Sequence, residues 1–169
     1  RSRQAEISGR NQILPRLRNG ESLALCTVIA SRGSTPQQRG AKMAILANGQ
    51  IFGTLGGGCV EAEVRARAIE QLSAGQSKAL SFRLDHDYGW DDGLICGGIM
   101  DIYIDVLRGA PAADKFQPIA DAIAARQPTE FTFSYASDTG ADTYREIISP
   151  SPNLVIAGAG HVGCALANI

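Results

Sequence analysis

The chain has 169 residues, with 16 Lys and Arg against 17 Asp and Glu, a length that suffices for one well-buried domain and a fragment of a second. Because the net charge is −1 and no basic block occurs, a small molecule or another protein is the expected partner, rather than nucleic acid or an anionic membrane surface. No apolar stretch approaches the roughly 18 to 20 residues that span a bilayer, and the N-terminus lacks the apolar centre of a signal peptide, so we expect a cytoplasmic protein.

The first part of the chain predicts a helix, a strand and a hairpin. Helical spacing over residues 7–17 indicates a peripheral helix, and the apolar run over residues 22–30 indicates a buried strand that ends at a loop. Two short apolar runs, 42–46 and 50–55, flank Asn48-Gly49, which is the strongest short-range signal for a β-hairpin.

An amphipathic helix follows, because the apolar period changes from two to about four after residue 58. One face carries Val60, Val64, Ala68 and Leu72, and Gly75 ends the helix. The later elements are a strand over 79–84, a half-exposed strand over 100–107, a helix over 112–126, and two strands over 130–135 and 143–148. We therefore expect a mixed α/β domain over residues 1–149.

Residues 153–163 carry a dinucleotide fingerprint. The apolar run 154–157 leads into Gly158, Gly160 and Gly163 at G-x-G-x-x-G spacing, and an apolar segment that suits a helix begins behind them. Such a domain needs an acidic residue about 20 positions further on, beyond residue 169. We therefore interpret residues 150–169 as the first strand and loop of an incomplete Rossmann-like domain, and expect no ordinary NAD binding by this chain.

The most informative stretch is residues 53–61, in which Gly56, Gly57 and Gly58 stand between a strand and the N-terminus of the amphipathic helix. Glycine leaves the backbone amides of this turn free to face a ligand, and the helix dipole there favours an anion. Cys59 lies in the first turn, where the same field lowers a thiol pKa, and this suggests sulfur or metal-cofactor chemistry. The alternative is a tight packing turn with a buried cysteine.

Two further segments offer ligand groups. Cys96 is followed by Gly97 and Gly98, where backbone can approach a ligand, although a β-bulge with a small core thiol explains the pattern equally. In the third segment Ser34, Thr35 and Arg39 offer hydroxyls and a guanidinium suited to phosphate. Without the Lys-Ser/Thr of a Walker loop it is no NTPase motif, and a plain turn is the alternative.

The four cysteines, Cys26, Cys59, Cys96 and Cys164, contain no CxxC pair. We expect reduced thiols rather than a disulfide scaffold or a structural zinc site. Because the segments around Cys59, Cys96 and residues 33–39 each lie at a strand end beside glycines, we also hypothesise that they share one pocket.

Taken in order, these motifs resemble the XdhC/CoxI family. The likeness covers Gly-Ser-Thr-Pro (33–36), Arg-Gly-Ala-Lys-Met (39–43), Gly-x-Leu-Gly-Gly-Gly-Cys-Val-Glu (53–61), Cys-Gly-Gly (96–98) and Gly-Ala-Gly-His-Val-Gly (158–163). Members are accessory proteins that mature molybdenum hydroxylases such as xanthine dehydrogenase, aldehyde oxidases or carbon monoxide dehydrogenase. The resemblance implies a C-terminal Rossmann-like domain. It also implies Cys59 and Cys96 as the thiols that contact molybdenum or its sulfur ligand, with Glu61 and the three glycines around the first.

The implied role is that of a carrier rather than a catalyst, and we assign no catalytic residue. A carrier would bind the molybdenum cofactor, molybdopterin or its dinucleotide form, support exchange of an oxo ligand for sulfur, and hand the cofactor to an apo molybdenum hydroxylase. A cysteine desulfurase is a further candidate partner, and a homodimer is expected from the resemblance. The alternative is an NAD(P)-dependent oxidoreductase whose N-terminal part is a substrate domain, with NAD(P) bound only by the full-length protein. A scaffold with inert thiols is a third interpretation.

Overall fold

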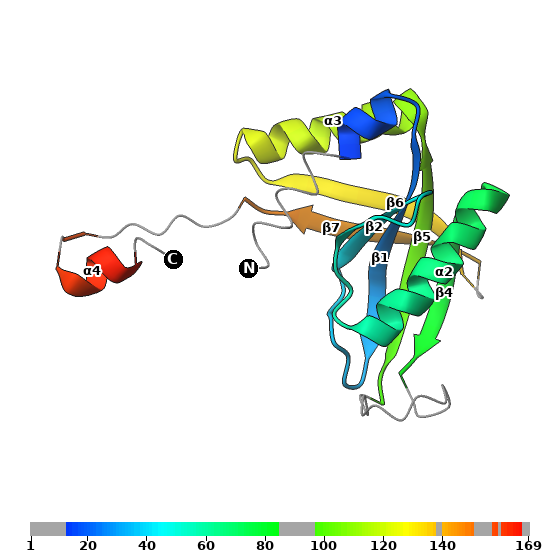
Figure 1. The fold of residues 1–169 in the computed structure, drawn as a ribbon, viewed down its shortest axis with the longest axis horizontal. Coiled ribbons are helices and arrows are strands. Elements are labelled where there is room, and N and C mark those ends of the chain that lie inside the picture. The colour runs from blue at the N-terminus through cyan, green and yellow to red at the C-terminus, as the bar shows by residue number, and fades with distance from the viewer. Residues whose placement is uncertain (1–12, 85–96, 138–139, 151–156, 159, 167–169) are drawn as a thin grey trace.

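The computed structural model describes residues 13–84, 97–137, 140–150, 157–158 and 160–166 (Figure 1). Residues 13–18 are helical. The strands are β1 (Ser22–Arg32), β2 (Lys42–Leu46), β3 (Ile51–Gly53), β4 (Lys78–Arg83), β5 (Ile99–Arg108), β6 (Thr129–Ser137) and β7 (Gly140–Ile148). The helices are α2 (Gly58–Ala74), α3 (Gly109–Ala124) and α4 (His161–Leu166).

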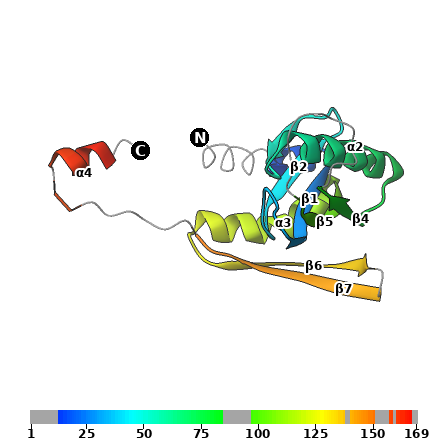
Figure 2. The same cartoon turned by 90° about the horizontal axis from the view of Figure 1, so that it is seen from below.

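The first five strands form one sheet in the order β3-β2-β1-β5-β4, and every neighbouring pair is antiparallel. β6 and β7 form a separate two-stranded hairpin. Viewed along its edge, the molecule has three layers: α2 on one side of the large sheet, the sheet itself, and the β6–β7 hairpin with α3 on the other side (Figure 2). This arrangement confirms the mixed α/β fold that the sequence predicts.

Local sequence signals explain how the chain enters and leaves the glycine-rich turn. In the β2–β3 hairpin, Gly49 adopts a φ of +81° and donates to the Leu46 carbonyl, as the Asn-Gly signal predicts. The chain then crosses the sheet as α2, from the β3 edge to the β4 edge, and Gly75 ends the helix in the left-handed conformation.

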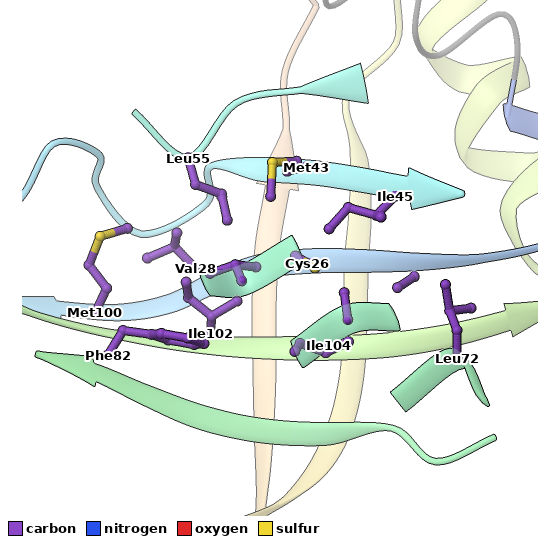
Figure 3. Packing of buried hydrophobic residues seen from close by; sticks show 13 residues of the cluster. Cys26, Val28, Met43, Ile45, Leu55, Leu72, Phe82, Met100, Ile102 and Ile104 are labelled. Carbon is purple, nitrogen blue, oxygen red and sulfur yellow. The ribbon is translucent and has the colours of Figure 1, made fainter. Parts of the chain in front are cut away.

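The main core lies between α2 and the sheet (Figure 3). The predicted apolar face of α2 is confirmed, because Val64 and Ala68 are fully buried and Leu72 nearly so. They pack against side chains from the sheet and from the turn before α2: Ala24, Cys26, Val28, Met43, Ile45, Leu55, Phe82, Met100, Ile102 and Ile104. Burial of this kind contributes about 1.5 to 3 kcal/mol for each large side chain, so α2 is firmly seated.

The opposite face of the sheet is covered by α3, the N-terminal helical residues and the hairpin. Leu17 is fully buried with Leu23, Leu107 and Ala113. The expectation of a merely peripheral N-terminal helix is therefore wrong for residues 13–18, because α3 and the sheet together form a pocket for Leu17 that its local sequence does not reveal.

Stacked aromatic rings attach the hairpin to the sheet. The Tyr103 ring of β5 lies 4.7 Å from that of Phe133, which lies 4.9 Å from that of Tyr144, both stacked. Phe131 and Ile29 complete this second core cluster. The alternation of buried and exposed residues along β6 follows from this packing, since only one face of the hairpin meets the sheet.

The C-terminal segment is described only in part. The predicted strand over 154–157 lies outside the described residues except for Ala157. Gly158 has a φ of +118°, and α4 begins just after Gly160. Val162 is 74% exposed. Among the described helices, none combines the length and the apolar character that crossing a bilayer requires.

Candidate functional site at the convergence of three loops

Three of the loops singled out by the sequence meet at one end of the large sheet. Ser34, after β1, forms a parallel bridge with Gly97, just before β5. The backbone of Gly56, after β3, lies against Pro36, since a Cβ at Gly56 would be 2.8 Å from the Pro36 carbonyl oxygen. The loop over residues 33–39, which we call the Ser-Thr loop, therefore touches both residues 97–98 and the turn over residues 54–58, which we call the glycine turn.

Two of the glycines in these motifs are explained by packing between the loops. Gly56 has a φ of +96° as well as the close contact with Pro36. A Cβ at Gly98 would overlap the Ser34 carbonyl oxygen and lie 2.7 Å from the Thr35 Cγ2 atom. For these two positions the packing interpretation is sufficient, because no side chain fits between the neighbouring backbones.

Gly57 and Gly58 differ from them. The φ of Gly57 is 172°, an extended conformation open to any residue, and Gly58 begins α2. A Cβ at either position would meet nothing within 4 Å. Neither strain nor crowding within the described part of the chain accounts for glycine here, and its effect is to leave the N-terminus of α2 bare for a close approach from outside.

Glu61 turns back from the first turn of α2 to the glycine turn. Its Oε1 atom accepts hydrogen bonds from the Leu55 amide at 2.9 Å, the Gly56 amide at 3.2 Å and the Thr54 hydroxyl. The expectation that the amides of this turn are free is therefore wrong for Leu55 and Gly56. A carboxylate near a helix N-terminus is also stabilised by the helix dipole, which favours this arrangement.

A shallow polar pocket of about 460 Å³ opens on the Ser-Thr loop. Its lining includes the three predicted residues of this loop, Ser34, Thr35 and Arg39, together with Ser31, Gly33 and Gln38. The Thr35 hydroxyl donates to the Gln37 carbonyl at 2.9 Å, so this hydrogen stabilises the loop rather than pointing at a ligand. The exposed Ser34 offers its hydroxyl to the pocket.

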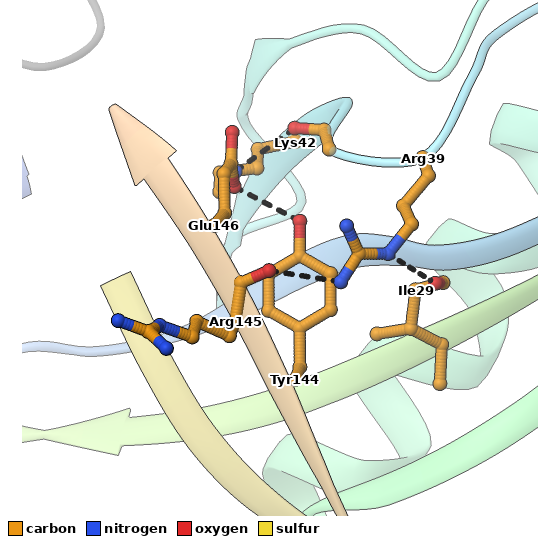
Figure 4. Close-up of polar contacts among 7 residues, drawn as sticks. Ile29, Arg39, Lys42, Tyr144, Arg145 and Glu146 are labelled. Atoms are coloured by element: carbon orange, nitrogen blue, oxygen red, sulfur yellow. Dashed lines mark hydrogen bonds and ion pairs between the residues drawn. The ribbon is translucent and has the colours of Figure 1, made fainter. Parts of the chain in front are cut away.

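Arg39 links the Ser-Thr loop to the hairpin (Figure 4). Its Nε donates to the Ile29 carbonyl at 3.1 Å and its Nη2 to the Arg145 carbonyl at 2.9 Å. The guanidinium also stacks 4.4 Å from the centre of the Tyr144 ring. These contacts bind protein atoms, so the structure uses much of the donor capacity that the sequence suggests for phosphate.

A second polar contact lies beside Arg39. Glu146 on β7 forms an ion pair with Lys42 of β2 and accepts a hydrogen bond from the Tyr144 hydroxyl at 2.9 Å. Burial raises the pKa of Tyr144 above its ordinary value, and the hydrogen bond to Glu146 and the charge of that carboxylate add to the shift. The hydroxyl therefore stays protonated and keeps donating across the physiological range of pH.

The cysteines occupy different environments. Cys59 is the second residue of α2, as predicted, while Cys96 lies outside the described residues, so the shared-pocket hypothesis is tested for the loops and not for the two sulfur atoms. Cys26 and Cys164 are free thiols, the first buried and the second exposed. Burial raises the pKa of the Cys26 thiol to about 12. Within the described ranges, no group of three or more His, Cys, Asp or Glu side chains is arranged to hold a metal ion.

Several residues that shape the site carry no signal in the local sequence. Pro36, Gln38 and Thr54 shape it through contacts with the other loops, and Tyr144 and Glu146 hold Arg39 and Lys42 from more than a hundred residues away. The spacing between Thr54 and Glu61, across a strand end and the first helical turn, is the one pattern from which such a contact could have been suspected.

Residues 16–83 match the model of the XdhC and CoxI family. The chain is 30% identical over 152 residues to the uncharacterized protein YqeB of Escherichia coli K12, covering 85% of this chain and 26% of YqeB. It is 30% identical over 95 residues to the molybdenum cofactor insertion chaperone PaoD of the same organism, covering 56% of this chain and 29% of PaoD. A probable xanthine dehydrogenase component of Bacillus subtilis 168 is 30% identical over 89 residues, with 52% and 27% covered.

The fold is similar to that of a solved protein as well. A crystal structure of a xanthine dehydrogenase from Bacillus halodurans superposes with a TM-score of 0.69 at 18% identity, over 82% of this chain and 52% of that one. The chain spans 26 to 29% of the length of the curated relatives. The glycine turn and the Ser-Thr loop both lie within the segment that matches the family model. Through that segment, the chain belongs to the XdhC and CoxI family.

Proposed function

We propose that this chain is part of an accessory protein that binds the molybdenum cofactor, supports its sulfuration and delivers it to an apo molybdenum hydroxylase. The name of the relative PaoD, a molybdenum cofactor insertion chaperone, supports a role in cofactor insertion. The observation that carries the proposal is structural: three glycine-containing loops meet at one end of the sheet, where Gly57 and Gly58 leave the N-terminus of α2 uncovered.

The residues present fit the two kinds of chemistry in a pterin cofactor that carries molybdenum. Backbone amides at a helix N-terminus suit the phosphate of the cofactor, and Gly57 and Gly58 let such a group come close. Soft thiolates suit the molybdenum-dithiolene centre, and Cys59 and Cys96 are the thiols next to these glycines in the sequence. The bound cofactor would supply the oxo-for-sulfur exchange, and the protein would bind and orient it.

The same proposal includes the organisation of the whole protein. Residues 1–149 form the cofactor-binding domain, and residues 150–169, with Gly158, Gly160 and Gly163, begin a Rossmann-like domain. An apo hydroxylase of the xanthine dehydrogenase type is the partner that receives the cofactor, a cysteine desulfurase is the source of sulfur, and the protein works as a homodimer. NAD(P) binding belongs to the alternative in which the full-length protein is an oxidoreductase.

The test is to purify the chain from cells that make molybdenum cofactor and to measure bound molybdenum and pterin. Gly58→Leu places a side chain where the ligand must approach, whereas Ala66→Leu adds the same side chain on an exposed part of the same helix. We expect the first change to lower the molybdenum content by about tenfold, the effect of losing one good contact, and the second to leave it unchanged. A wild-type chain without molybdenum would contradict the proposal, and NAD-dependent turnover by the full-length protein would favour the oxidoreductase.

A further inference from the structure

The glycine turn already contains an anion of its own. The Oε1 atom of Glu61 accepts two backbone amides and the Thr54 hydroxyl, and the Thr54 Oγ1 atom in turn accepts from the Gly56 amide at 3.0 Å. Successive amides that converge on one negatively charged oxygen are the arrangement by which backbone loops bind anions. Here the oxygen comes from the chain itself.

The contacts on either side of Glu61 show what this anion holds in place. Leu55 is fully buried in the main core, and Gly56 lies against Pro36 of the Ser-Thr loop. Glu61 belongs to the first turn of α2, whose first backbone hydrogen bond runs from the Glu61 amide to the Gly57 carbonyl at 3.0 Å. The carboxylate therefore connects the helix, the core and the Ser-Thr loop through one atom.

We propose that Glu61 is a positioning residue that serves as the built-in anion of the glycine turn. It sets the path of residues 54–58, and hence the place of Gly57, Gly58 and Cys59, and it withholds the Leu55 and Gly56 amides from any incoming ligand. Its importance for cofactor binding rests on the proposed function, but the effect on the turn does not. Glu61 was expected from the sequence to contact the cofactor, and the proposal gives it an indirect role instead.

The experiment compares Glu61→Ala and Glu61→Gln with wild type in the 169-residue chain. Glu70→Ala serves as the matched control, because it removes a carboxylate from the exposed, C-terminal half of the same helix. Amide hydrogen exchange is measured at Leu55 and Gly56, with β5 amides as a check that the fold persists. Formate, a free carboxylate, is then added to Glu61→Ala, with chloride at equal ionic strength as its control. The alkylation rate of Cys59 is measured in each variant.

In Glu61→Ala we expect exchange at Leu55 and Gly56 to rise by about tenfold or more, as the loss of charge-assisted hydrogen bonds predicts, and the Cys59 alkylation rate to change with it. Formate should reverse both effects and chloride should not, whereas Glu70→Ala should exchange like wild type. In Glu61→Gln we expect a smaller rise, because a neutral acceptor forms weaker hydrogen bonds.

Unchanged exchange at Leu55 and Gly56 in a folded Glu61→Ala chain would overturn the proposal, whatever its molybdenum content. If that variant fails to fold, unchanged exchange in Glu61→Gln would overturn it equally. A wild-type chain that binds no molybdenum would instead contradict the proposed function and leave this result standing.

Discussion

Glycines that look alike in the sequence have different physical roles at the site. Gly56 is required by its left-handed conformation and by its contact with Pro36, while its neighbour Gly57 is extended and uncrowded. The run of three glycines thus combines a structural position with positions that the fold itself does not demand. This difference gives a direct test in which neighbouring positions receive the same substitution.

We expect Gly56→Ala to destabilise the chain by about 2 to 4 kcal/mol, because a left-handed alanine costs about 1 to 2 kcal/mol and the overlap with Pro36 adds to it. Gly57→Ala should change stability by no more than about 1 kcal/mol. Urea unfolding followed by circular dichroism measures both values. Equal destabilisation by the two variants would mean that the glycine turn is not packed as described.

Cys26 gives a prediction about pH. Burial raises the pKa of its thiol from an ordinary 9.0 to about 12, so the folded state holds this proton more tightly than the unfolded state does. The corresponding stability is fully present below about pH 9 and is lost as the pH rises toward 12. Between about pH 8 and pH 10.5 we expect the wild-type chain to lose about 2 kcal/mol more than Cys26→Ala does, as measured by urea unfolding. Equal losses would show that the Cys26 thiol is not shielded from solvent. The tyrosines titrate alike in both chains and cancel from the comparison.

Among the elements, the β6–β7 hairpin is attached to the large sheet by two different kinds of contact. Aromatic rings fill the space between hairpin and sheet, and at the rim Arg39 and Lys42 contact β7. Because Arg39 also lines the pocket of the Ser-Thr loop, the position of the hairpin and the shape of that pocket depend on the same side chain.

We expect Arg39→Ala to lower stability by about 1 to 3 kcal/mol, since it removes two charge-assisted hydrogen bonds that are partly exposed. Arg145→Ala removes an arginine whose partner Glu130 lies on the outer face of the hairpin, and should cost no more than about 0.5 kcal/mol. Hydrogen exchange should show faster exchange in β6 and β7 of Arg39→Ala and unchanged exchange in β5. If β5 exchanges faster to the same degree, Arg39 stabilises the whole domain rather than the hairpin.

Considered as a whole molecule, the described chain contains one packed body over residues 13–150 and a short C-terminal segment with exposed residues. The large sheet, its two coverings and the three loops of the site all belong to the first part. In the described part of the second, Val162 and Cys164 are exposed, although apolar side chains of this kind are normally buried in a complete domain.

We therefore expect deletion of residues 151–169 to leave the melting temperature unchanged to within about 2 °C, because little of the packed core is lost. Light scattering on both chains tests whether the exposed segment recruits a second copy. We expect a larger mass for the 169-residue chain and a monomer after the deletion. A fall of many degrees in melting temperature would show that the segment packs against the first domain.

Several elements follow from the sequence by itself, because their causes act over a few residues. The period of Val64, Ala68 and Leu72 specifies one buried face of α2, Gly75 ends that helix, and Asn48-Gly49 turns the chain between β2 and β3. The same local motifs also indicate which loops carry ligand groups and which family the chain resembles.

Only the tertiary structure decides what those groups do. It places Gly98 against Ser34, supplies a carboxylate from Glu61 to amides that local reasoning leaves free, and directs Arg39 to a carbonyl 106 residues away. Strand order and loop contacts of this kind depend on which distant surfaces bury each other, and an arginine or an amide binds whichever acceptor that packing brings near. Local residue patterns contain no information about that choice.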